Sequence, residues 1–132
     1  MSKVIKPISD ELNELATLAI NEAVIVHKTL GPGLLESVYE ACLVYELRKM
    51  GLSVESQATV PVHYDDIVVN ANLRIDILIE NQLAIEVKSV SELADIHTAQ
   101  LLTYLKLMNL RLGLLLNFNS VVLIDGLKRV AN

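Results

Sequence analysis

Residues 73–88 read LRIDILIENQLAIEVK, and this stretch decides the fold. Two mostly aliphatic runs, 73–79 and 83–90, flank the polar segment 80–82. Aliphatic and β-branched residues on both sides of a short polar connection are typical of a β-hairpin. We therefore expect two antiparallel strands joined by a three-residue turn.

This hairpin has one apolar face and one mixed face, because side chains alternate between the two sides of a strand. The expected apolar face comprises Ile75, Ile77, Ile79, Leu83, Ile85 and Val87. The mixed face comprises Arg74, Asp76, Leu78, Ala84, Glu86 and Lys88. A three-residue turn sets Asp76 opposite Glu86 and Arg74 opposite Lys88 in an antiparallel pair. Two carboxylates are therefore expected to face each other.

The facing carboxylates of Asp76 and Glu86 have two interpretations. Like charges directly opposite each other destabilise a sheet by up to about 1 kcal/mol, and a divalent cation offsets this repulsion. Mg²⁺ or Mn²⁺ suits the pair, because hard cations prefer oxygen ligands and no Cys or paired His accompanies it. Alternatively, these charges and that of Lys88 only keep an exposed edge hairpin soluble. Charged strand faces are common, so the three residues alone favour the second interpretation.

Patterns on both sides of the hairpin predict an α/β domain. Helices are expected from about Leu12 to Thr29, Leu34 to Met50 and Ile96 to Met108, and further strands over 54–62, 67–69, 112–116 and 121–124. The second helix is expected to face the core through Leu35, Val38, Cys42, Val44 and Leu47. The order ααβββαββ indicates a mixed central sheet flanked by helices, and 132 residues suit a single domain, 1–132.

The formal net charge is −5, and all of the excess lies in the first half of the chain. Residues 1–70 carry five Lys and Arg against ten Asp and Glu, whereas residues 71–132 carry six against six. Nonspecific affinity for a phosphate backbone comes mainly from Lys and Arg. The charge therefore argues against an autonomous, tight nucleic-acid binder, but it allows an enzyme that meets nucleic acid through a metal ion and a few local cations.

The chain has no segment that predicts a membrane anchor or secretion. Its apolar stretches are interrupted well before the roughly 20 residues that a membrane span needs. The first ten residues lack the basic and apolar regions of a secretory signal, and the single cysteine, Cys42, has no partner for an intrachain disulfide. We expect a cytoplasmic protein.

Three motifs together resemble a known nuclease family. Asp76, followed after nine residues by Glu86-Val87-Lys88, resembles the signature of the PD-(D/E)XK nuclease superfamily, although Ile75 stands where the superfamily's title has proline. Residues 33–39, GLLESVY, resemble the motif of the GxxExxY proteins within that superfamily. Gln100, three further residues and Tyr104 resemble the QxxxY helix motif of its RecB-like branch.

This resemblance implies a restriction-endonuclease-like core and a Mg²⁺- or Mn²⁺-dependent nuclease, with DNA favoured over RNA as the substrate. It implies that Asp76, Glu86 and Glu36 bind the metal. It also implies that Lys88 contacts the attacking water or the scissile phosphate, and that Gln100 holds Lys88 or the substrate. With Asp76 and Glu86, these two residues form the expected catalytic set. Four residues are candidates for substrate contact or support of the site: Tyr104, Arg74, Tyr39 and His97.

Several of these residues have simpler explanations. Glu36 can be a first-turn acid favoured by the helix dipole, and the two tyrosines, Tyr39 and Tyr104, can pack at the edge of the core. The three histidines lie on different expected elements, which argues against zinc. Two other functions also remain open. One is a non-catalytic nucleic-acid-binding or assembly module, in which a homodimer or a partner protein completes the function, and the other is a hydrolase of small phosphate compounds.

Overall fold

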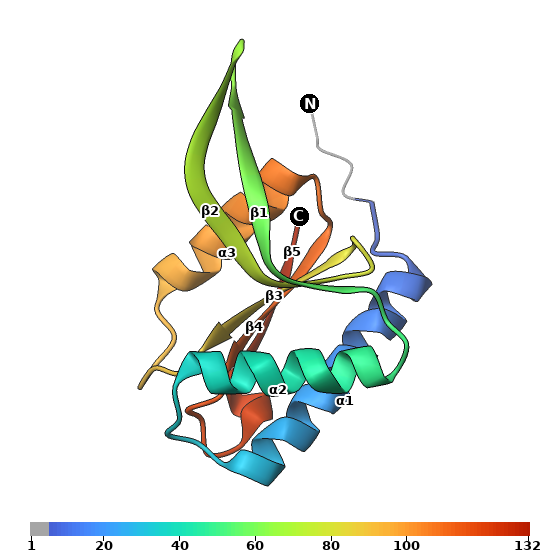
Figure 1. Cartoon of the computed structure of the whole chain (residues 1–132), viewed down its shortest axis with the longest axis vertical. Coiled ribbons are helices and arrows are strands. Elements are labelled where there is room, and N and C mark those ends of the chain that lie inside the picture. The colour runs from blue at the N-terminus through green and yellow to red at the C-terminus, as the bar shows by residue number, and fades with distance from the viewer. Residues whose placement is uncertain (1–5) are drawn as a thin grey trace.

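The computed structural model describes residues 6–132 and places helices on both faces of a mixed sheet (Figure 1). The helices are α1 (Asp10–Leu30), α2 (Glu36–Lys49) and α3 (Asp95–Met108), and a 3₁₀ helix, η1, spans Leu123–Gly126. The strands are β1 (Val54–Tyr64), β2 (Ile67–Ile79), β3 (Leu83–Lys88), β4 (Leu112–Asn117) and β5 (Leu127–Ala131). The order of helices and strands, ααβββαββ, is the predicted one, although β2 joins two of the expected segments and β5 lies beyond the expected segment 121–124.

The strands are arranged in the order β1-β2-β3-β4-β5. β3 and β4 are parallel, and the other neighbouring strands are antiparallel. A parallel pair needs a long crossover connection, and α3 provides it between β3 and β4. β3 lies in the middle of the sheet and all its residues except Lys88 are buried, so the charges at its C-terminal end lie next to the core.

Two hydrophobic layers cover the sheet. The layer between the sheet and helices α1 and α2 includes Ala19, Ala23, Leu43, Leu47, Ile77, Ile85 and Leu114. The layer between the sheet and α3 includes Ala58, Ile75, Ala84, Leu101, Leu105 and Leu115. Burial of one such Leu or Ile side chain contributes roughly 1.5–3 kcal/mol, so these two layers hold the helices on their faces of the sheet.

The first helix begins at Asp10, two residues before the expected start at about Leu12. The hydroxyl of Ser9 accepts a hydrogen bond from the N–H of Leu12 at 3.2 Å, as an N-cap residue does. The helix ends at Gly31, which has a positive φ of 74° and donates its N–H to the carbonyl of His27. Within residues 6–132, none of the helices combines the length and the apolar character that a membrane crossing requires.

Residues 80–82 form the predicted three-residue turn between β2 and β3. The N–H of Gln82 donates to the carbonyl of Ile79 at 2.9 Å. Glu80 and Asn81 adopt left-handed backbone angles, with φ values of 52° and 53°. Asn adopts this conformation more readily than most residues. The turn therefore fixes the hairpin in the predicted register.

β2 is longer than the sequence predicts, because the segments 67–69 and 73–79 belong to one strand. Together with β1 it forms a ribbon that extends well beyond the rest of the sheet (Figure 1). The register between the two strands shifts at Pro61, and Asn72 has a positive φ of 54° in this irregular part. The bulge explains why the apolar pattern is interrupted between the two segments.

The predicted strand over 121–124 is wrong. The N–H of Ser120 donates to the carbonyl of Asn117, so the chain turns directly after β4 instead of continuing into a strand. η1 follows, and β5 begins only after it. Leu123 is buried against the core, whereas Val121 is 85% exposed. The apolar segment 121–124 thus buries Leu123 in the core and does not form a strand with one buried face.

α2 faces the core through a set of residues that differs in part from the predicted one. Leu35 and Val38 are exposed, whereas Tyr39 and Leu43 are fully buried. Leu35 lies at the N-cap, before the first helical residue, and the ring of Tyr39 stacks on Phe118 with centroids 4.6 Å apart. This stacking orients the helix. The other predicted core positions are Cys42, which is half-buried, and Val44 and Leu47, which are buried.

Ile75 lies on the opposite face of the sheet from Ile77, although strand alternation predicts the same face. Ile75 packs in the layer under α3, and Ile77 packs under α1 and α2. Gln57 of β1, which faces this part of β2, has no partner in the strand ladder and a left-handed φ of 56°. The irregular backbone breaks the alternation, so Asp76 lies where β2 passes from one layer to the other.

Candidate active site

Asp76 on β2 and Glu86 on β3 lie side by side where the hairpin ladder ends. The last paired residues of the two strands are Ile77 and Ile85. Beyond them, the N–H of Asp76 donates to Oε1 of Glu86 at 3.1 Å. The N–H of Val87 donates to Oδ2 of Asp76 at 2.8 Å. Side-chain carboxylates thus replace backbone carbonyls as acceptors, and this exchange holds the two acids next to each other.

Glu86 is a buried carboxyl group, with only 7% of the residue exposed. Burial and, after it, the negative charge of Asp76 raise the pKa of Glu86 from 4.5 to about 8. The N–H of Asp76 and the positive charge of Lys88 lower this pKa, but by less. A buried acid beside a second acid needs a positive charge nearby if it is to ionise. This position therefore favours a cation.

Glu40 on α2 and Gln57 on β1 extend the acidic group on the other side of Asp76. The side-chain nitrogen of Gln57 donates to Oε1 of Glu40 at 2.7 Å and to Oδ1 of Asp76 at 3.2 Å. The hydroxyl of Ser56 donates to Oε2 of Glu40 at 3.2 Å. Burial and then the charge of Asp76 raise the pKa of Glu40. Two acids from two other elements, Glu40 of α2 and Glu86 of β3, therefore lie on either side of Asp76.

Glu36, the predicted metal ligand on α2, makes a different kind of contact. Its Oε1 accepts a hydrogen bond from the N–H of Ser89 at 3.1 Å, and the hydroxyl of Ser89 donates to the carbonyl of Leu34 at 2.7 Å. Tyr39 supports the same corner, because its hydroxyl donates to the carbonyl of Gly31 at 2.5 Å and accepts from the N–H of Leu34. Glu36 and Tyr39 thus join the start of α2 to the end of β3.

Lys88 ends β3 and lies opposite Asn117 of the parallel strand β4. It is half-buried, and within residues 6–132 its ammonium group makes no ion pair. Only 3% of Asn117 is exposed. Its side-chain oxygen accepts a hydrogen bond from the N–H of Val90 at 3.1 Å, and its side-chain nitrogen donates to the carbonyl of Val90 at 2.9 Å. The backbone after Lys88 is therefore fixed while its ammonium group stays available.

α3 brings Tyr104 close to the acids and leaves Gln100 more open. Tyr104 is buried on the inner side of α3, and its pKa is raised by burial and by the charges of Glu86 and Asp76. Gln100 precedes Tyr104 by four residues, so it lies on the same side of the helix, but its side chain is exposed. Tyr104 thus lies close to the carboxylates, whereas Gln100, one turn earlier on α3, is exposed.

Within residues 6–132, the side chains of the other two candidate residues form their hydrogen bonds with groups other than the acids. The ring nitrogen Nδ1 of His97 accepts a hydrogen bond from the N–H of Ala94 at 3.0 Å, which caps the first turn of α3. Arg74 is exposed on the outer part of the β1–β2 ribbon, and its guanidinium contacts Asn72 at 3.4 Å. The ladder between β2 and β3 ends before Arg74 could pair with Lys88.

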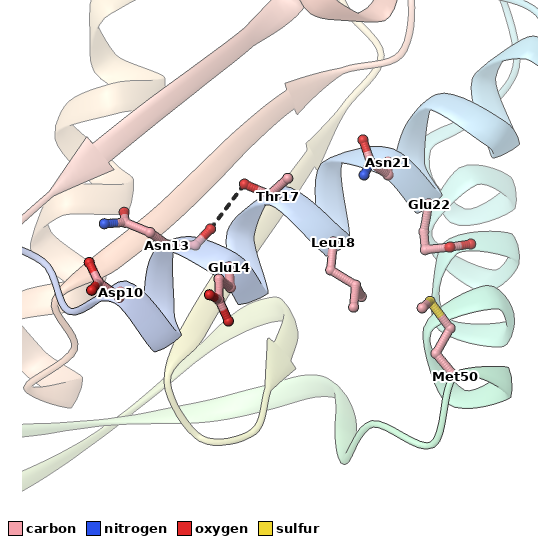
Figure 2. Close-up of a pocket in the computed structure, with 8 residues that line it drawn as sticks. All are labelled: Asp10, Asn13, Glu14, Thr17, Leu18, Asn21, Glu22 and Met50. Carbon is pink, nitrogen blue, oxygen red and sulfur yellow. Dashed lines mark hydrogen bonds between the residues drawn. The ribbon is translucent and has the colours of Figure 1, made fainter.

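A hollow of about 560 Å³ lies elsewhere, between α1 and Met50 at the end of α2 (Figure 2). Its lining comprises Asp10, Asn13, Glu14, Thr17, Leu18, Asn21, Glu22 and Met50. None of the residues around Asp76 takes part in it. The hollow is a groove on a polar helix surface, and the carboxylates of the candidate site lie outside it.

The donor atoms around Asp76 suit a hard divalent cation by their chemistry. The acids supply only oxygen ligands, and burial together with the charge of Asp76 raises the pKa of Glu86. Within residues 6–132, however, no three His, Cys, Asp or Glu side chains converge closely enough to enclose a metal ion. The amide of Gln57 lies between Glu40 and Asp76, where it donates to both. Glu36 does not join this group.

Four residues around the site were not expected from the sequence: Glu40, Gln57, Ser89 and Asn117. Glu40 had a signal, because it follows Glu36 by four residues and such residues share one side of a helix. Gln57 and Asn117 had none. Their roles depend on strands that are distant in the sequence, and a polar residue in a strand is ordinarily a surface residue.

A family model described as the PD-(D/E)XK nuclease superfamily matches residues 13–130. Comparison with curated proteins and with solved structures gives no match. The matched range includes Asp76, Glu86 and Lys88 and spans most of the described helices and strands, whose arrangement is consistent with a restriction-endonuclease-like core. The chain, an α/β fold with paired acids and a lysine at the end of a central strand, belongs to the PD-(D/E)XK nuclease superfamily.

Proposed function

We propose that this protein is a nuclease that hydrolyses phosphodiester bonds in nucleic acid, with DNA favoured over RNA and Mg²⁺ or Mn²⁺ as its cofactor. The observation that carries the proposal is the buried carboxyl of Glu86 beside Asp76, with Lys88 two residues further along β3. Membership of the superfamily supports nuclease chemistry. The motifs at residues 33–39 and 100–104 support assignment to its GxxExxY group, with a RecB-like QxxxY helix.

In this proposal the carboxylates of Asp76 and Glu86 hold the divalent cation. A cation bound there supplies a Lewis acid for a phosphoryl oxygen and lowers the pKa of a bound water. Lys88 contacts the scissile phosphate, and its ammonium group offsets the negative charge that grows in the transition state. The proposal gives Lys88 this electrostatic role and not the role of a general base.

Residues on α3 and on the β1–β2 ribbon complete the proposed site. Gln100 is exposed next to Tyr104 and would contact the substrate or hold Lys88. Tyr104 donates its hydroxyl toward the acids or the phosphate. Arg74 is an exposed cation that a nucleic-acid strand can reach. His97 supports the site through the start of α3, where it accepts a hydrogen bond from Ala94.

Two observations favour a different or additional function. The acidic excess of the first half of the chain suits a small phosphate compound better than a long polyanion. The outer part of the β1–β2 ribbon exposes Tyr64, Ile67 and Val68, at 72%, 58% and 67%, and such a surface favours a homodimer or a partner protein. If the exposed ribbon binds a second copy or a partner protein, the protein is a non-catalytic nucleic-acid-binding or assembly module. In either proposal we take residues 1–132 as a single, cytoplasmic domain.

Two experiments test the proposed function. Calorimetric titration with Mg²⁺ and Mn²⁺ should show binding that Asp76→Ala and Glu86→Ala each abolish. The purified protein should then be incubated with Mn²⁺ and single-stranded, double-stranded and branched DNA, RNA and free nucleotides. Cleavage of DNA that Lys88→Ala removes supports the nuclease. Cleavage of free nucleotides alone supports the small-phosphate hydrolase, and cleavage of no substrate supports the module.

A further inference from the structure

Asn117 is a buried polar residue at the end of an otherwise apolar strand. The residues before it in β4, Leu114, Leu115 and Leu116, are fully buried. Asn117 is itself only 3% exposed, and it lies directly opposite Lys88 in the parallel pair of β3 and β4. Burial of a side-chain amide is unfavourable unless its polar atoms form hydrogen bonds. The partners of Asn117 therefore indicate why a polar residue stands at this position.

Both polar atoms of the Asn117 side chain bind the backbone of Val90. Oδ1 accepts a hydrogen bond from the N–H of Val90, and Nδ2 donates to its carbonyl. Oδ1 also accepts from the N–H of Asn119 at 3.3 Å, and Asn side chains commonly form turns of this kind. The turn uses only the oxygen. It does not explain the bond from Nδ2, which joins β4 to the segment that follows Lys88.

Two neighbours of Asn117 bind the same segment. The N–H of Phe118 donates to the carbonyl of Lys88 at 2.8 Å, which continues the pairing of β3 with β4. Nδ2 of Asn119 donates to the carbonyl of Val90 at 3.2 Å, so this carbonyl accepts from two side chains. Residues 117–119 thus hold the chain on both sides of Ser89. The backbone at the end of β3 is fixed by the turn after β4.

The position of the Lys88 ammonium group depends on this backbone. The group lies near enough to Glu86 for its charge to lower the pKa of that carboxyl. Within residues 6–132 it forms no ion pair, so no partner side chain fixes its place there. A displacement of about 1 Å at a reacting group can lower the rate of an enzyme by about 100-fold. Support of the backbone at the end of β3 is therefore important for a catalytic lysine.

We propose that Asn117 is a positioning residue of the candidate site: it binds both polar groups of Val90, holds the end of β3, and thereby directs the ammonium group of Lys88 toward the scissile phosphate. The inference rests on the proposed function, because it takes Lys88 as the residue that contacts this phosphate. Asn117 does not itself touch the substrate or a metal ion, and its effect on the reaction passes through Lys88.

A double-mutant cycle on the full chain tests this role. Asn117→Leu keeps a side chain of similar size and removes both bonds to Val90. It should lower kcat for DNA cleavage with Mn²⁺ by about 10- to 100-fold and leave KM within about twofold, because Lys88 acts in the transition state. In the Lys88→Ala background, the same substitution should change kcat by less than about twofold, since no ammonium group remains to be positioned.

Two controls separate positioning from general damage. Leu112 is fully buried at the other end of β4, so Leu112→Ala should destabilise the fold and leave kcat unchanged. Mn²⁺ affinity, measured by electron paramagnetic resonance, should be the same in Asn117→Leu as in the wild type. The bonds that hold Asp76 and Glu86 together come from backbone N–H groups before Lys88, and the substitution leaves them in place.

Asn119→Ala provides a second variant if Asn117→Leu does not fold. Asn119 is half-buried, and its substitution removes only one of the two donors to the carbonyl of Val90. It should lower kcat by about threefold, again only when Lys88 is present.

Three results would overturn the inference while the nuclease stands. They are wild-type kcat in Asn117→Leu, a loss of the same size with and without Lys88, and a loss of Mn²⁺ affinity, which would show that the whole end of the hairpin is displaced. If the wild type cleaves none of the substrates, the proposed function fails and this inference fails with it.

Discussion

The two halves of β2 have opposite surroundings. The inner half, 77–79, pairs with both β1 and β3 and is buried. The outer half, 67–72, is exposed on both faces, and within it residues 67–69 pair with β1. Asp76 lies at the boundary, half-buried and just beyond the last residue that pairs with β3. The candidate site thus occupies the point where one strand leaves the body of the sheet.

The difference between the halves explains how two acids can lie together near a core. Inside the sheet, backbone N–H groups bind backbone carbonyls, and a carboxylate there would have no donor. At the boundary the strands separate, and the N–H groups of Asp76 and Val87 become available to Glu86 and Asp76. The backbone N–H that Glu86 accepts lowers the pKa of this carboxyl, although burial and the charge of Asp76 raise it by more. The end of a strand ladder therefore provides free backbone N–H groups for carboxylates, and the interior of the ladder does not.

The largest expected effect is on activity, and it tests whether the boundary is the site. Lys88→Ala should lower kcat by about 100- to 1000-fold, the range seen when one preorganised group that stabilises transition-state charge is removed. His63→Ala, on the exposed outer ribbon, should leave cleavage unchanged. Steady-state cleavage of the best DNA substrate with Mn²⁺ measures both. Equal losses in the two variants would place the substrate on the ribbon instead.

The second prediction compares the stability contributed by the two halves. Ile77→Ala should lower the free energy of unfolding by about 3 kcal/mol, because Ile77 is fully buried in the layer under α1 and α2. Val68→Ala, at a residue that is 67% exposed, should lower it by less than about 0.5 kcal/mol. Urea denaturation followed by circular dichroism gives both values. A large loss in Val68→Ala would mean that the ribbon is covered in solution.

The third prediction concerns pH and the buried acid at the boundary. The pKa of Glu86 rises from 4.5 to about 8 on folding, so between these values the folded protein holds a proton that the unfolded chain has released. Its contribution to stability is complete below pH 4.5 and is lost as the pH rises toward 8. Within that window, each pH unit removes about 1.4 kcal/mol.

Glu86→Gln isolates this effect, because the amide keeps the acceptor oxygen and does not titrate. In EDTA, the free energy of unfolding of the wild type relative to Glu86→Gln should fall by about 2 kcal/mol between pH 5.5 and 7. Denaturant unfolding at several pH values measures the difference. Parallel curves for the two proteins would show that Glu86 ionises normally in the folded state and is better solvated than its burial indicates.

The smallest expected effect tests whether the outer half keeps its shape in solution. Asn72 has a φ of 54° at the irregular part of β2. Asn72→Gly should leave the free energy of unfolding within about 0.5 kcal/mol of the wild type, whereas Asn72→Ala should lower it by about 1 kcal/mol. Thermal unfolding of the three proteins provides the comparison. Identical values for Gly and Ala would contradict a fixed left-handed backbone at this position.

Much of the inner half could be predicted from the sequence, because its information is local. The turn at 80–82 and the alternation beside it were enough to place Asp76 next to Glu86. The face of Ile75 could not be predicted, since it depends on the backbone of Gln57, which is distant in the sequence. The strand expected over 121–124 was wrong for a similar reason. Its apolar residues are compatible with a strand or with a short segment that buries a single side chain, and the chain turns after Asn117, so the second arrangement forms.

The candidate site was predictable in its motif residues and not in its supporting ones. Asp76, Glu86 and Lys88 form a recognisable spacing on two adjacent strands. Glu36 also belongs to a recognisable motif, but a motif gives a position and not the partner of the side chain. Which of two glutamates on α2 faces the acids depends on how the helix lies on the sheet. That orientation depends on tertiary packing, which includes the stacking of Tyr39 on Phe118 and the burial of Leu43 and Leu47.

The side chain of Asn117 has a consequence for the mobility of the chain beyond β3. Its amide binds the N–H and the carbonyl of Val90 as a neighbouring strand would, although β3 ends at Lys88. The N–H of Val90 should therefore exchange its hydrogen with solvent as slowly as the amides inside the sheet. The segment carrying Lys88 then cannot fray, and motion of its ammonium group is confined to the side chain.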